Sequence, residues 1–418
     1  MREMKDSGFN WLRQIPQTWE VFKIKDGFTR KKSKALKNDP TVLSLARSGV
    51  KVRDISTNEG QLAASYYEYN PVAIDDMLLN PMDLQSGANC SISKVEGVIS
   101  PAYINLRYKK GFNPVFYDYY FKYQYWSYAF FSYGKGVSFD NRWTLNEDTL
   151  MNLPLLVPPT DEQKAIAKFL DRECSKIDEV MADIQNQIDV LEEHKRSVIA
   201  EVVTKGLNPN VNLKKTNVSW ASLIPSHWDV MPNKYIMKKV KNICAVHNDE
   251  DIISLSMNGV IVRDLDAGGK MPTSFDGYQF VYPGNLLMCL FDYDVTPRCI
   301  GFINNYGITS PAYSQFQMKN GNSAKYYYYY YLMIDNTKEL LHLAKNLRHS
   351  FTEDELGKIN QIVPPIEEQD EIAAYLDKKI ADIDSIIADK KSELDTLEGY
   401  KKSLIYEYVT GKKEVPNE

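Results

Sequence analysis

Cysteine and histidine are scarce in this chain, and neither occurs at a spacing that suits a metal site. The 418 residues include five cysteines and five histidines, with no CxxC pair and no Cys/His cluster at the spacing of zinc ligands. The sequence therefore predicts structural thiols, a reducing compartment and no bound metal.

Long apolar segments are missing as well. No run of about 18 uncharged apolar residues occurs, and the first residues, MREMKDSGFNWL, lack the apolar core of a secretory signal. We therefore expect a cytoplasmic protein that has no membrane partner.

Recognisable catalytic motifs are absent too. The sequence has no GxxxxGK[ST] loop, no GxGxxG fingerprint and no HExxH motif. Adenine methyltransferases need an acidic or amide residue followed by two prolines and an aromatic residue. The Asn-Pro pairs at 70–71, 80–81, 113–114 and 208–209 have neither the second proline nor the aromatic residue. We expect no catalytic residue in this chain.

What the chain does contain is an internal repeat. Four segments of the first copy return in the same order in the second: IPQTW at Ile15 as IPSHW at Ile224, SLARSGVKVRD at Ser44 as SLSMNGVIVRD at Ser254, SPAY at Ser100 as SPAY at Ser310, and VPPTDEQ at Val157 as VPPIEEQ at Val363. A period of roughly 200 residues is too long for a solenoid, whose units run about 20 to 50 residues. Each copy should therefore be a globular domain with a connecting segment.

The expected fold class is α+β, with two similar mixed α/β domains separated by two long helices and an internal pseudo-two-fold repeat. Short apolar runs separated by Gly, Asn and Pro indicate strands and turns within each domain. The predicted boundaries are 1–158 and 207–364 for the domains, 159–206 for the first helix, and 365–418 for the second helix with a C-terminal tail.

Each domain also carries an aromatic tract, at 117–133 in the first copy and at 326–331 in the second. Aromatic residues at this density are typical of a helix that packs into the domain core. Stacking on single-stranded bases is the alternative.

The segments after Val157 and Val363 have the heptad pattern of a coiled coil. Apolar residues recur every seventh position along one seam line: Leu170, Ile177, Ile184, Leu191 and Val198, then Leu376, Ile383, Leu397 and Leu404. Cys174, Met181, Ile188 and Val202, then Ile380, Ile387, Leu394 and Tyr408, fill the second line, and Lys195, Lys390 and Lys401 interrupt the pattern. Thr160 and Gln163 have the spacing of a capping box at the start of the first helix.

An apolar stripe this narrow needs a partner with a matching stripe. We expect the two helices to pair as an antiparallel coiled coil within one chain. Pairing between two chains is the second possibility, and packing of each helix on its own domain is the third.

The net charge of −5 does not decide the partner, because the acidic excess lies in the two periodic segments. The domains are neutral to mildly basic, which permits a local positive face. Candidate phosphate contacts are the clustered lysines Lys31, Lys32, Lys238, Lys239 and Lys241. Candidate base-reading residues are arginines at equivalent positions of the repeat, Arg53 with Arg263 and Arg142 with Arg348. A solvated face or a structural ion pair would explain the same residues.

Taken together, these features resemble the specificity (S) subunits of Type I restriction-modification systems. The resemblance covers nearly the whole chain and depends on the order of the paired Ile-Pro…Trp openings, the SPAY tetrads, the VPPxxEQ helix entries and the endings EVVTKGL at Glu201 and EYVTGKK at Glu407. It implies two target-recognition domains, each reading half of a split double-stranded DNA site, with the coiled coil setting their separation.

The resemblance also implies partners that supply the chemistry. Methyltransferase (M) subunits would bind this chain, and it allows a translocating nuclease (R) subunit as a further partner. The chain itself would catalyse nothing and hold no cofactor, with S-adenosylmethionine, Mg²⁺ and ATP expected only on the partner subunits. Because the domains agree between copies only in short segments, we expect the two half-sites to differ.

Two other classes of function remain open from the sequence. One is a coiled-coil tethering protein that does not read DNA sequence. The other is an autonomous nuclease or methyltransferase whose site has no recognisable motif.

Overall fold

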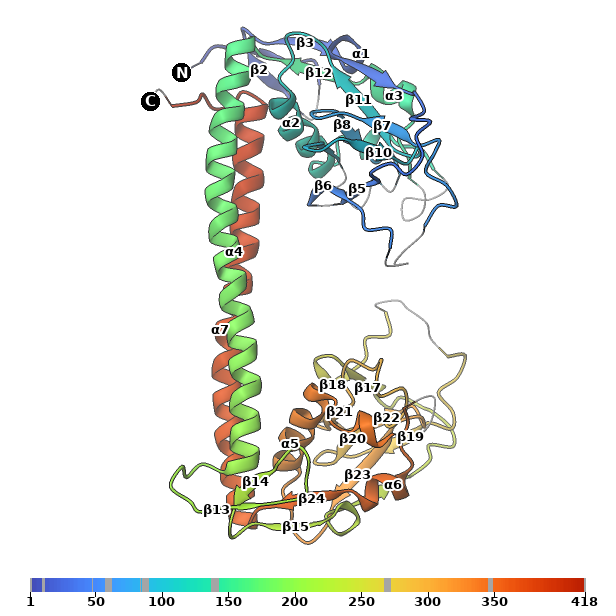
Figure 1. Cartoon of the computed structure of the whole chain (residues 1–418), viewed down its shortest axis with the longest axis vertical. Coiled ribbons are helices and arrows are strands. Elements are labelled where there is room, and N and C mark those ends of the chain that lie inside the picture. Colours follow the sequence, from blue (N-terminus) through green and yellow to red (C-terminus); the bar gives the residue numbers. More distant parts are fainter. Residues whose placement is uncertain are drawn as a thin grey trace. The chain divides into compact units, whose positions relative to one another are not determined.

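The structure is a computed structural model that describes residues 2–9, 12–46, 48–56, 62–82, 84, 90–136, 143–266, 272–344 and 349–416. The chain divides into two compact units, one formed by Met1–Ile184 with Ser392–Glu418 and the other by Gln185–Lys391. Each unit holds one copy of the mixed domain and part of each long helix (Figure 1).

The first unit is built around a four-stranded antiparallel sheet of strand order β4-β11-β8-β9. The described residues of this unit also form the two-stranded ladders β1-β2, β3-β12, β5-β6 and β7-β10. The elements before the long helix are β1 (Met4–Asp6), β2 (Gln14–Pro16), β3 (Glu20–Lys23), α1 (Ile24–Gly27), β4 (Phe28–Lys31), β5 (Leu43–Ala46), β6 (Gly49–Val52), β7 (Asn70–Val72), β8 (Met77–Leu79), β9 (Cys90–Ile92), β10 (Gly97–Ile99), β11 (Ile104–Tyr108), α2 (Pro114–Trp126), η2 (Phe131–Tyr133), α3 (Glu147–Asn152) and β12 (Pro154–Val157).

The second unit repeats this plan around a sheet of order β16-β23-β20-β21. Its two-stranded ladders are β13-β14, β15-β24, β17-β18 and β19-β22. The elements are β13 (Leu213–Lys215), β14 (Leu223–Pro225), β15 (Asp229–Pro232), η3 (Asn233–Tyr235), β16 (Met237–Val240), β17 (Ile253–Ser256), β18 (Gly259–Val262), β19 (Gln279–Val281), β20 (Leu286–Met288), β21 (Ile300–Phe302), β22 (Gly307–Thr309), β23 (Ser314–Met318), α5 (Ala324–Thr337), η4 (Leu341–Leu343), α6 (Glu353–Lys358) and β24 (Asn360–Val363). The expected α+β fold class and the duplication are both confirmed.

The aromatic tract forms the core helix in each domain, as predicted. Asn113 caps α2 by accepting a hydrogen bond from the Phe116 amide at 3.0 Å, and α2 packs against β9. Tyr117 and its counterpart Tyr327 are fully buried. Their hydroxyls donate to the carbonyl oxygens of Leu156 and Ile362, at 3.0 and 3.2 Å. These rings are therefore packed in the core and are not available to stack on bases.

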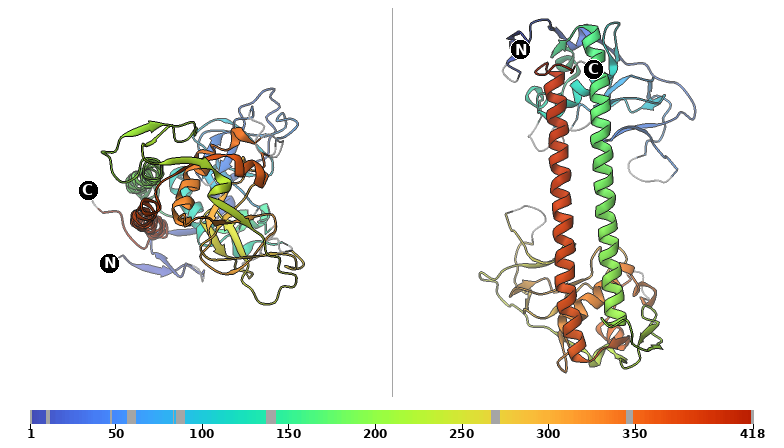
Figure 2. Two further views of the ribbon diagram at one scale, coloured as in Figure 1. Left: turned by 90° about the horizontal axis from the view of Figure 1, so that it is seen from below. Right: turned by 90° about the vertical axis from the view of Figure 1, so that its left-hand side faces the viewer.

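The two long helices are α4 (Thr160–Lys205) and α7 (Ile366–Val409). In the first unit the N-terminal half of α4 packs on the C-terminal half of α7, where Leu170 and Ile177 share a cluster with Leu404. In the second unit the opposite halves meet. The helices thus pair antiparallel within one chain (Figure 2). This is the first of the three arrangements that the sequence allows.

The predicted seam residues line this helix pair. The structure buries Leu170, Ile177, Ile184, Leu376, Ile383 and Leu404 and leaves Leu191, Val198 and Leu397 partly buried.

Two of the lysines that interrupt the seam make ion pairs between the helices. In the second unit, Lys195 Nζ lies 2.7 Å from Asp384 Oδ1. In the first, Lys401 Nζ lies 2.7 Å from Asp178 Oδ2. These two ion pairs occupy equivalent positions of the repeat. Lys195 and Lys401, which interrupt the apolar seam, therefore have the same role in both copies.

The predicted capping box at the start of α4 is wrong. Gln163 does not fold back on the helix N-terminus, because its side chain is buried against the domain. Its amide donates to the carbonyl oxygen of Pro158 at 2.9 Å and accepts from the Asn113 amide at 2.8 Å. The Gln163 side chain thus bonds to backbone groups of the domain, including the loop before α2, and does not cap its own helix.

Candidate nucleic-acid interface

The predicted contacts in the first unit start at the sheet edge. Lys31, on β4, lies with Nζ 2.7 Å from Oδ2 of Asp76, whose side chain is fully buried. Arg107 reaches the other oxygen of this carboxylate at 3.2 Å. A buried carboxylate needs such partners, so Lys31 has a structural role that the sequence did not reveal.

Lys32 lies beside Lys31 but faces solvent, with 67% of its side chain exposed and Nζ 3.0 Å from Glu147. Arg30 points inward, donating to the carbonyl oxygens of Lys31 and Asn105 at 2.9 and 3.2 Å. Burial lowers the pKa of the Arg30 guanidinium, and the nearby Glu147 opposes that shift. Of these three cations, Lys32 is the one that solvent and a phosphate can reach.

In the second unit the predicted lysines lie on and after β16. Lys238 and Lys241 are exposed. Lys239 is three-quarters buried and pairs with Glu353 of α6. Lys238 and Lys241 are therefore the accessible cations of this strand.

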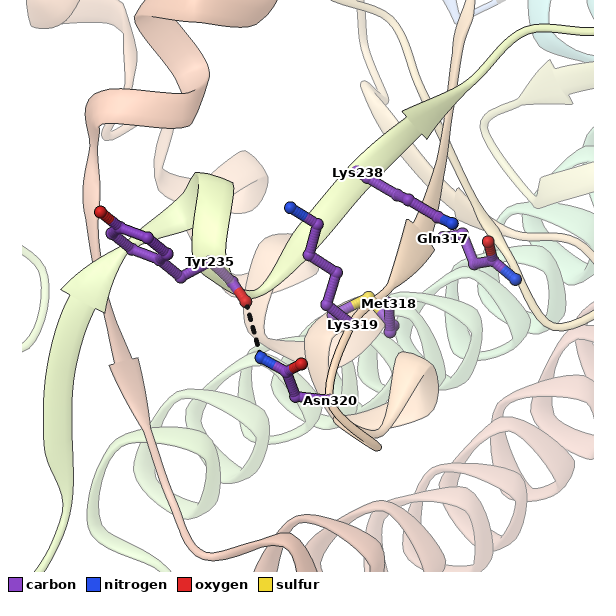
Figure 3. Close-up of a pocket in the computed structure, with 6 residues that line it drawn as sticks. All are labelled: Tyr235, Lys238, Gln317, Met318, Lys319 and Asn320. Atoms are coloured by element: carbon purple, nitrogen blue, oxygen red, sulfur yellow. Dashed lines mark hydrogen bonds between the residues drawn. The ribbon is translucent and has the colours of Figure 1, made fainter.

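Lys238 lines a surface cavity of about 590 Å³ between β16 and the end of β23 (Figure 3). The other lining residues are Tyr235, Gln317, Met318, Lys319 and Asn320. Two ammonium groups and two side-chain amides here can donate hydrogen bonds, which suits an oxyanion such as a phosphate.

Lys319 is not among the residues predicted from the sequence, although the internal repeat contains a signal for it. Lys319 Nζ donates to the carbonyl oxygen of Lys234 at 2.8 Å. In the first unit Lys109 Nζ donates to the carbonyl oxygen of Lys25 at the same distance. Alignment of YKKG at Tyr108 with MKNG at Met318 would have placed both lysines at equivalent positions.

The predicted base-reading arginines Arg53 and Arg263 directly follow β6 and β18, the second strands of two equivalent hairpins. Their amides donate to the carbonyl oxygens of Val42 and Ile252, at 2.8 and 2.7 Å, and both residues are partly exposed. The hairpins carry exposed apolar side chains as well, including Val52, which is 58% exposed. Because the same backbone hydrogen bond holds each arginine at the end of its hairpin, Arg53 and Arg263 occupy equivalent positions in the two domains.

Asp54 and Asp264, which follow these arginines, accept hydrogen bonds within their own loops. Asp54 accepts from the side chain and the amide of Ser56, at 2.7 and 2.9 Å, and these bonds lower its pKa. Asp264 accepts from the Asp266 amide at 2.9 Å. The other predicted arginines, Arg142 and Arg348, lie outside the described residues.

A matching set of hydrogen bonds joins each domain to its long helix. Trp19 Nε1 donates to Glu162 of α4 at 3.0 Å, and Trp228 Nε1 donates to Glu368 of α7 at 2.9 Å. The hydroxyl of Tyr329 donates to Asp377 at 2.7 Å, and the first unit has the same bond between Tyr119 and Asp171 at 2.9 Å. The orientation of each domain on its helix is therefore fixed by side chains that recur in both copies.

Within the described ranges, no group of three or more His, Cys, Asp or Glu side chains is arranged to hold a metal ion. The helices in those ranges also include none that is long and apolar enough to cross a membrane.

Comparison with known proteins identifies the family. A family model described as the Type I restriction modification DNA specificity domain matches residues 16–190 and 300–396. Two proteins of Methanocaldococcus jannaschii are similar in sequence. The specificity subunit of the type I restriction enzyme MjaX is 24% identical over 285 residues, and that of MjaVIII is 25% identical over 287 residues. These alignments cover 65% and 64% of this chain but only 62% and 63% of the relatives, so the chain spans less than two thirds of their length.

The fold agrees with this family. A solved structure from work on complex assembly and conformational transition of the type I R-M system aligns with a TM-score of 0.68, covering 96% of this chain and 99% of the other at 12% identity. At that identity the likeness concerns the fold alone. The family model, however, covers more than half of the sequence, and the chain therefore belongs to the Type I restriction-modification DNA specificity family.

Proposed function

We propose that this chain is the non-catalytic DNA-recognition subunit of a Type I restriction-modification complex, in which each domain reads one half of a bipartite, asymmetric DNA site. The observation that carries the proposal is the repeated joint between domain and helix. Trp19 with Glu162 and Trp228 with Glu368 hold two different domains in the same way on one antiparallel helix pair. Such an arrangement suits two readers held at a fixed separation.

The proposed contacts with DNA fall into two classes. Lys32, Lys238, Lys241 and Lys319 are suited to phosphates, because their ammonium groups are accessible or line the cavity beside β16. Arg53 and Arg263 are suited to base edges or phosphates near the hairpins. Lys31, Lys239, Arg142 and Arg348 complete the proposed contacts, and a phosphate would compete with Asp76 for Lys31 and with Glu353 for Lys239.

The proposed partners are double-stranded DNA and methyltransferase subunits, with a nuclease subunit as an additional component. S-adenosylmethionine, Mg²⁺ and ATP would be held by those partners. The solved structure of similar fold comes from work on assembly of the type I R-M system, which supports a role in a multi-subunit complex.

The test is to assemble the chain with methyltransferase subunits from its own source and to map methylated adenines on random DNA. The proposal predicts one bipartite sequence with two different halves and an unread spacer. Methylation without sequence preference would contradict it and favour a tethering protein. Methyl transfer by the purified chain alone would favour an autonomous enzyme.

Single substitutions then separate the classes of contact. When the logarithm of the DNA association constant is plotted against the logarithm of the salt concentration, Lys238→Ala and Lys319→Ala should each reduce the magnitude of the slope by about 0.9, because one phosphate contact is lost. Lys378→Ala, at an exposed lysine of α7, is the matched control and should leave the slope unchanged. Arg263→Ala should cost about 1–3 kcal/mol of discrimination at one base pair if the guanidinium bonds a base, whereas a uniform loss across sequences marks a phosphate contact.

A further inference from the structure

Two cysteines of the second domain lie opposite each other at the adjacent ends of the neighbouring strands β20 and β21. Cys289 follows β20 and Cys299 precedes β21, and the Cys289 amide donates to the Cys299 carbonyl oxygen at 2.8 Å. This bond extends the register in which Met288 pairs with Ile300. Residues directly opposite in such a pair have Cα atoms about 5.5 Å apart and side chains on the same face. A disulfide requires a Cα separation of about 4.4–6.8 Å, and this register is compatible with that spacing.

The surroundings of the two thiols differ. A hydrogen bond from the Cys299 thiol lowers the pKa of Cys289, and the same bond raises the pKa of Cys299. Lys338 Nζ lies 3.6 Å from Cys299 Sγ, held by Asp335 and the Thr296 carbonyl oxygen, each at 2.7 Å. The thiol–thiol hydrogen bond thus makes Cys289 the thiol that ionises more readily, while the Lys338 ammonium opposes the rise in the pKa of Cys299.

The pair closes the base of a loop, residues 290–298. The tip of this loop is open to solvent, since Val295 is 73% exposed. At its end, Arg298 donates to the Met257 carbonyl oxygen at 2.9 Å and to the Tyr328 hydroxyl at 2.6 Å. Met257 lies at the turn between β17 and β18, the hairpin that precedes Arg263. A change at the cysteine pair can thus reach this hairpin through Arg298.

The first domain has no such pair. The position equivalent to Cys289, directly after β8, is Asn80, whose side chain accepts from the Met82 amide at 3.0 Å. Any chemistry of the cysteine pair is therefore confined to the second domain.

We propose that Cys289 and Cys299 are a redox-active pair that a two-electron oxidant of the peroxide class converts into a disulfide. The Cys289 thiolate attacks one peroxide oxygen and becomes a sulfenic acid, while the other oxygen leaves as hydroxide. The Cys299 sulfur then attacks the sulfenic sulfur, forming the S–S bond and releasing water as its own proton is lost. The two cysteines together lose two electrons and hydrogen peroxide is reduced to two waters.

The consequence for DNA rests on the proposed function. Because Arg298 couples the loop to the β17–β18 hairpin, oxidation should change the affinity for the half-site read by the second domain. The half-site read by the first domain should be unaffected. Formation of the disulfide does not depend on DNA, so the two parts of the inference can fail separately.

The test uses the full chain treated with hydrogen peroxide and then quenched with catalase. Thiols titrated after denaturation should fall from five to three per chain, with a Cys289–Cys299 cross-link in the peptide map. A Cys289→Ser chain should keep its four thiols, and a Cys244→Ser control should lose two of four. Five remaining thiols, or a cross-link between other cysteines, would overturn the proposal.

A second measurement separates the inference from the proposed function. The oxidised and reduced chains, each assembled with methyltransferase subunits, are titrated with DNA altered in one half-site at a time. A shift restricted to the second half-site supports the coupling through Arg298. A disulfide that forms without any such shift removes the coupling and leaves both the redox pair and the proposed DNA reading intact.

Discussion

The indole Nε1 of Trp228 donates a hydrogen bond to Oε2 of Glu368 at 2.9 Å, and the carboxylate accepts this bond from a ring that is fully buried. The other oxygen, Oε1, lies 2.6 Å from His227 Nε2. Because Glu368 belongs to the first turn of α7, the bond ties the opening segment of the second domain to the beginning of its helix. The same relationship between Trp19 and Glu162 in the first unit makes it a property of the repeat.

Replacing the indole of Trp228 by a phenyl ring should weaken the contact between the second domain and α7, while an aromatic side chain still occupies the core. Trp228→Phe keeps an aromatic ring but removes the N–H group, so it should lower the free energy of unfolding by about 1.5–3 kcal/mol, the range for a hydrogen bond to a charged group. Urea denaturation measures this loss. Glu368→Gln keeps an acceptor and should cost less than Glu368→Ala, and equal losses for the two would exclude the hydrogen bond as the cause.

A second buried side chain at each joint, Gln163 or Gln369, should contribute more. Gln369 donates to the Pro364 carbonyl oxygen at 2.8 Å and accepts from the Ser323 amide at 2.8 Å, and it has no exposed surface. Gln369→Ala should therefore cost about 1–3 kcal/mol for each backbone group left without a partner. Gln185→Ala, at an exposed glutamine of α4, is the matched control. If both variants unfold at the same urea concentration, Gln369 does not anchor the helix.

The ion pair between Lys195 and Asp384 should stabilise the helix pair only weakly. Asp384 is 54% exposed, and exposed pairs typically contribute about 0.2–1 kcal/mol. Lys195→Glu should lower the free energy of unfolding, and adding Asp384→Lys should restore most of the loss. Urea denaturation of the four proteins gives the coupling energy, and additive effects would show that the two side chains do not interact.

Alkaline pH should unfold the protein as its buried tyrosines ionise. Burial raises the pKa of Tyr326 and Tyr327 well above the ordinary value, which is about 10 in an unfolded chain. Above pH ~10 the folded protein therefore retains protons that the unfolded chain loses, and the free energy of unfolding falls as pH rises. The part of the phenolate absorbance that comes from the buried tyrosines should increase in a cooperative step, together with the loss of helical circular dichroism. Ionisation of all 28 tyrosines while the helical circular dichroism is intact would contradict this burial.

The duplicated plan, the long helices and the aromatic core helices could be predicted because their signals are local. A heptad pattern of apolar residues or a dense aromatic tract can be recognised within one segment, and the internal repeat shows which segments of the two copies correspond. The basic clusters were equally visible, yet the sequence could not show that Lys31 neutralises buried Asp76 while Lys32 faces solvent. That difference depends on which way a strand faces in the folded sheet.

The features that were missed come from contacts between distant segments. Gln163 has the spacing of a capping residue, but the loop before α2 supplies better partners for its amide. Lys319 and Lys238 line one cavity because β16 and β23 are neighbours in the sheet. Cys289 and Cys299 meet through the register of β20 and β21. None of these pairings follows from local propensity or from composition.

The most direct test of the account is to shorten the helix pair by one heptad. Deleting residues 185–191 of α4 and 387–393 of α7, around the contact between Gln187 and Lys390, preserves both heptad registers and shortens the pair by about 10 Å at 1.5 Å per residue. Methylated sites mapped with the assembled complex should then keep both half-site sequences, with a spacer shorter by about three base pairs at 3.4 Å each. An unchanged spacer alongside intact recognition of both half-sites would contradict the claim that the helix pair sets the separation.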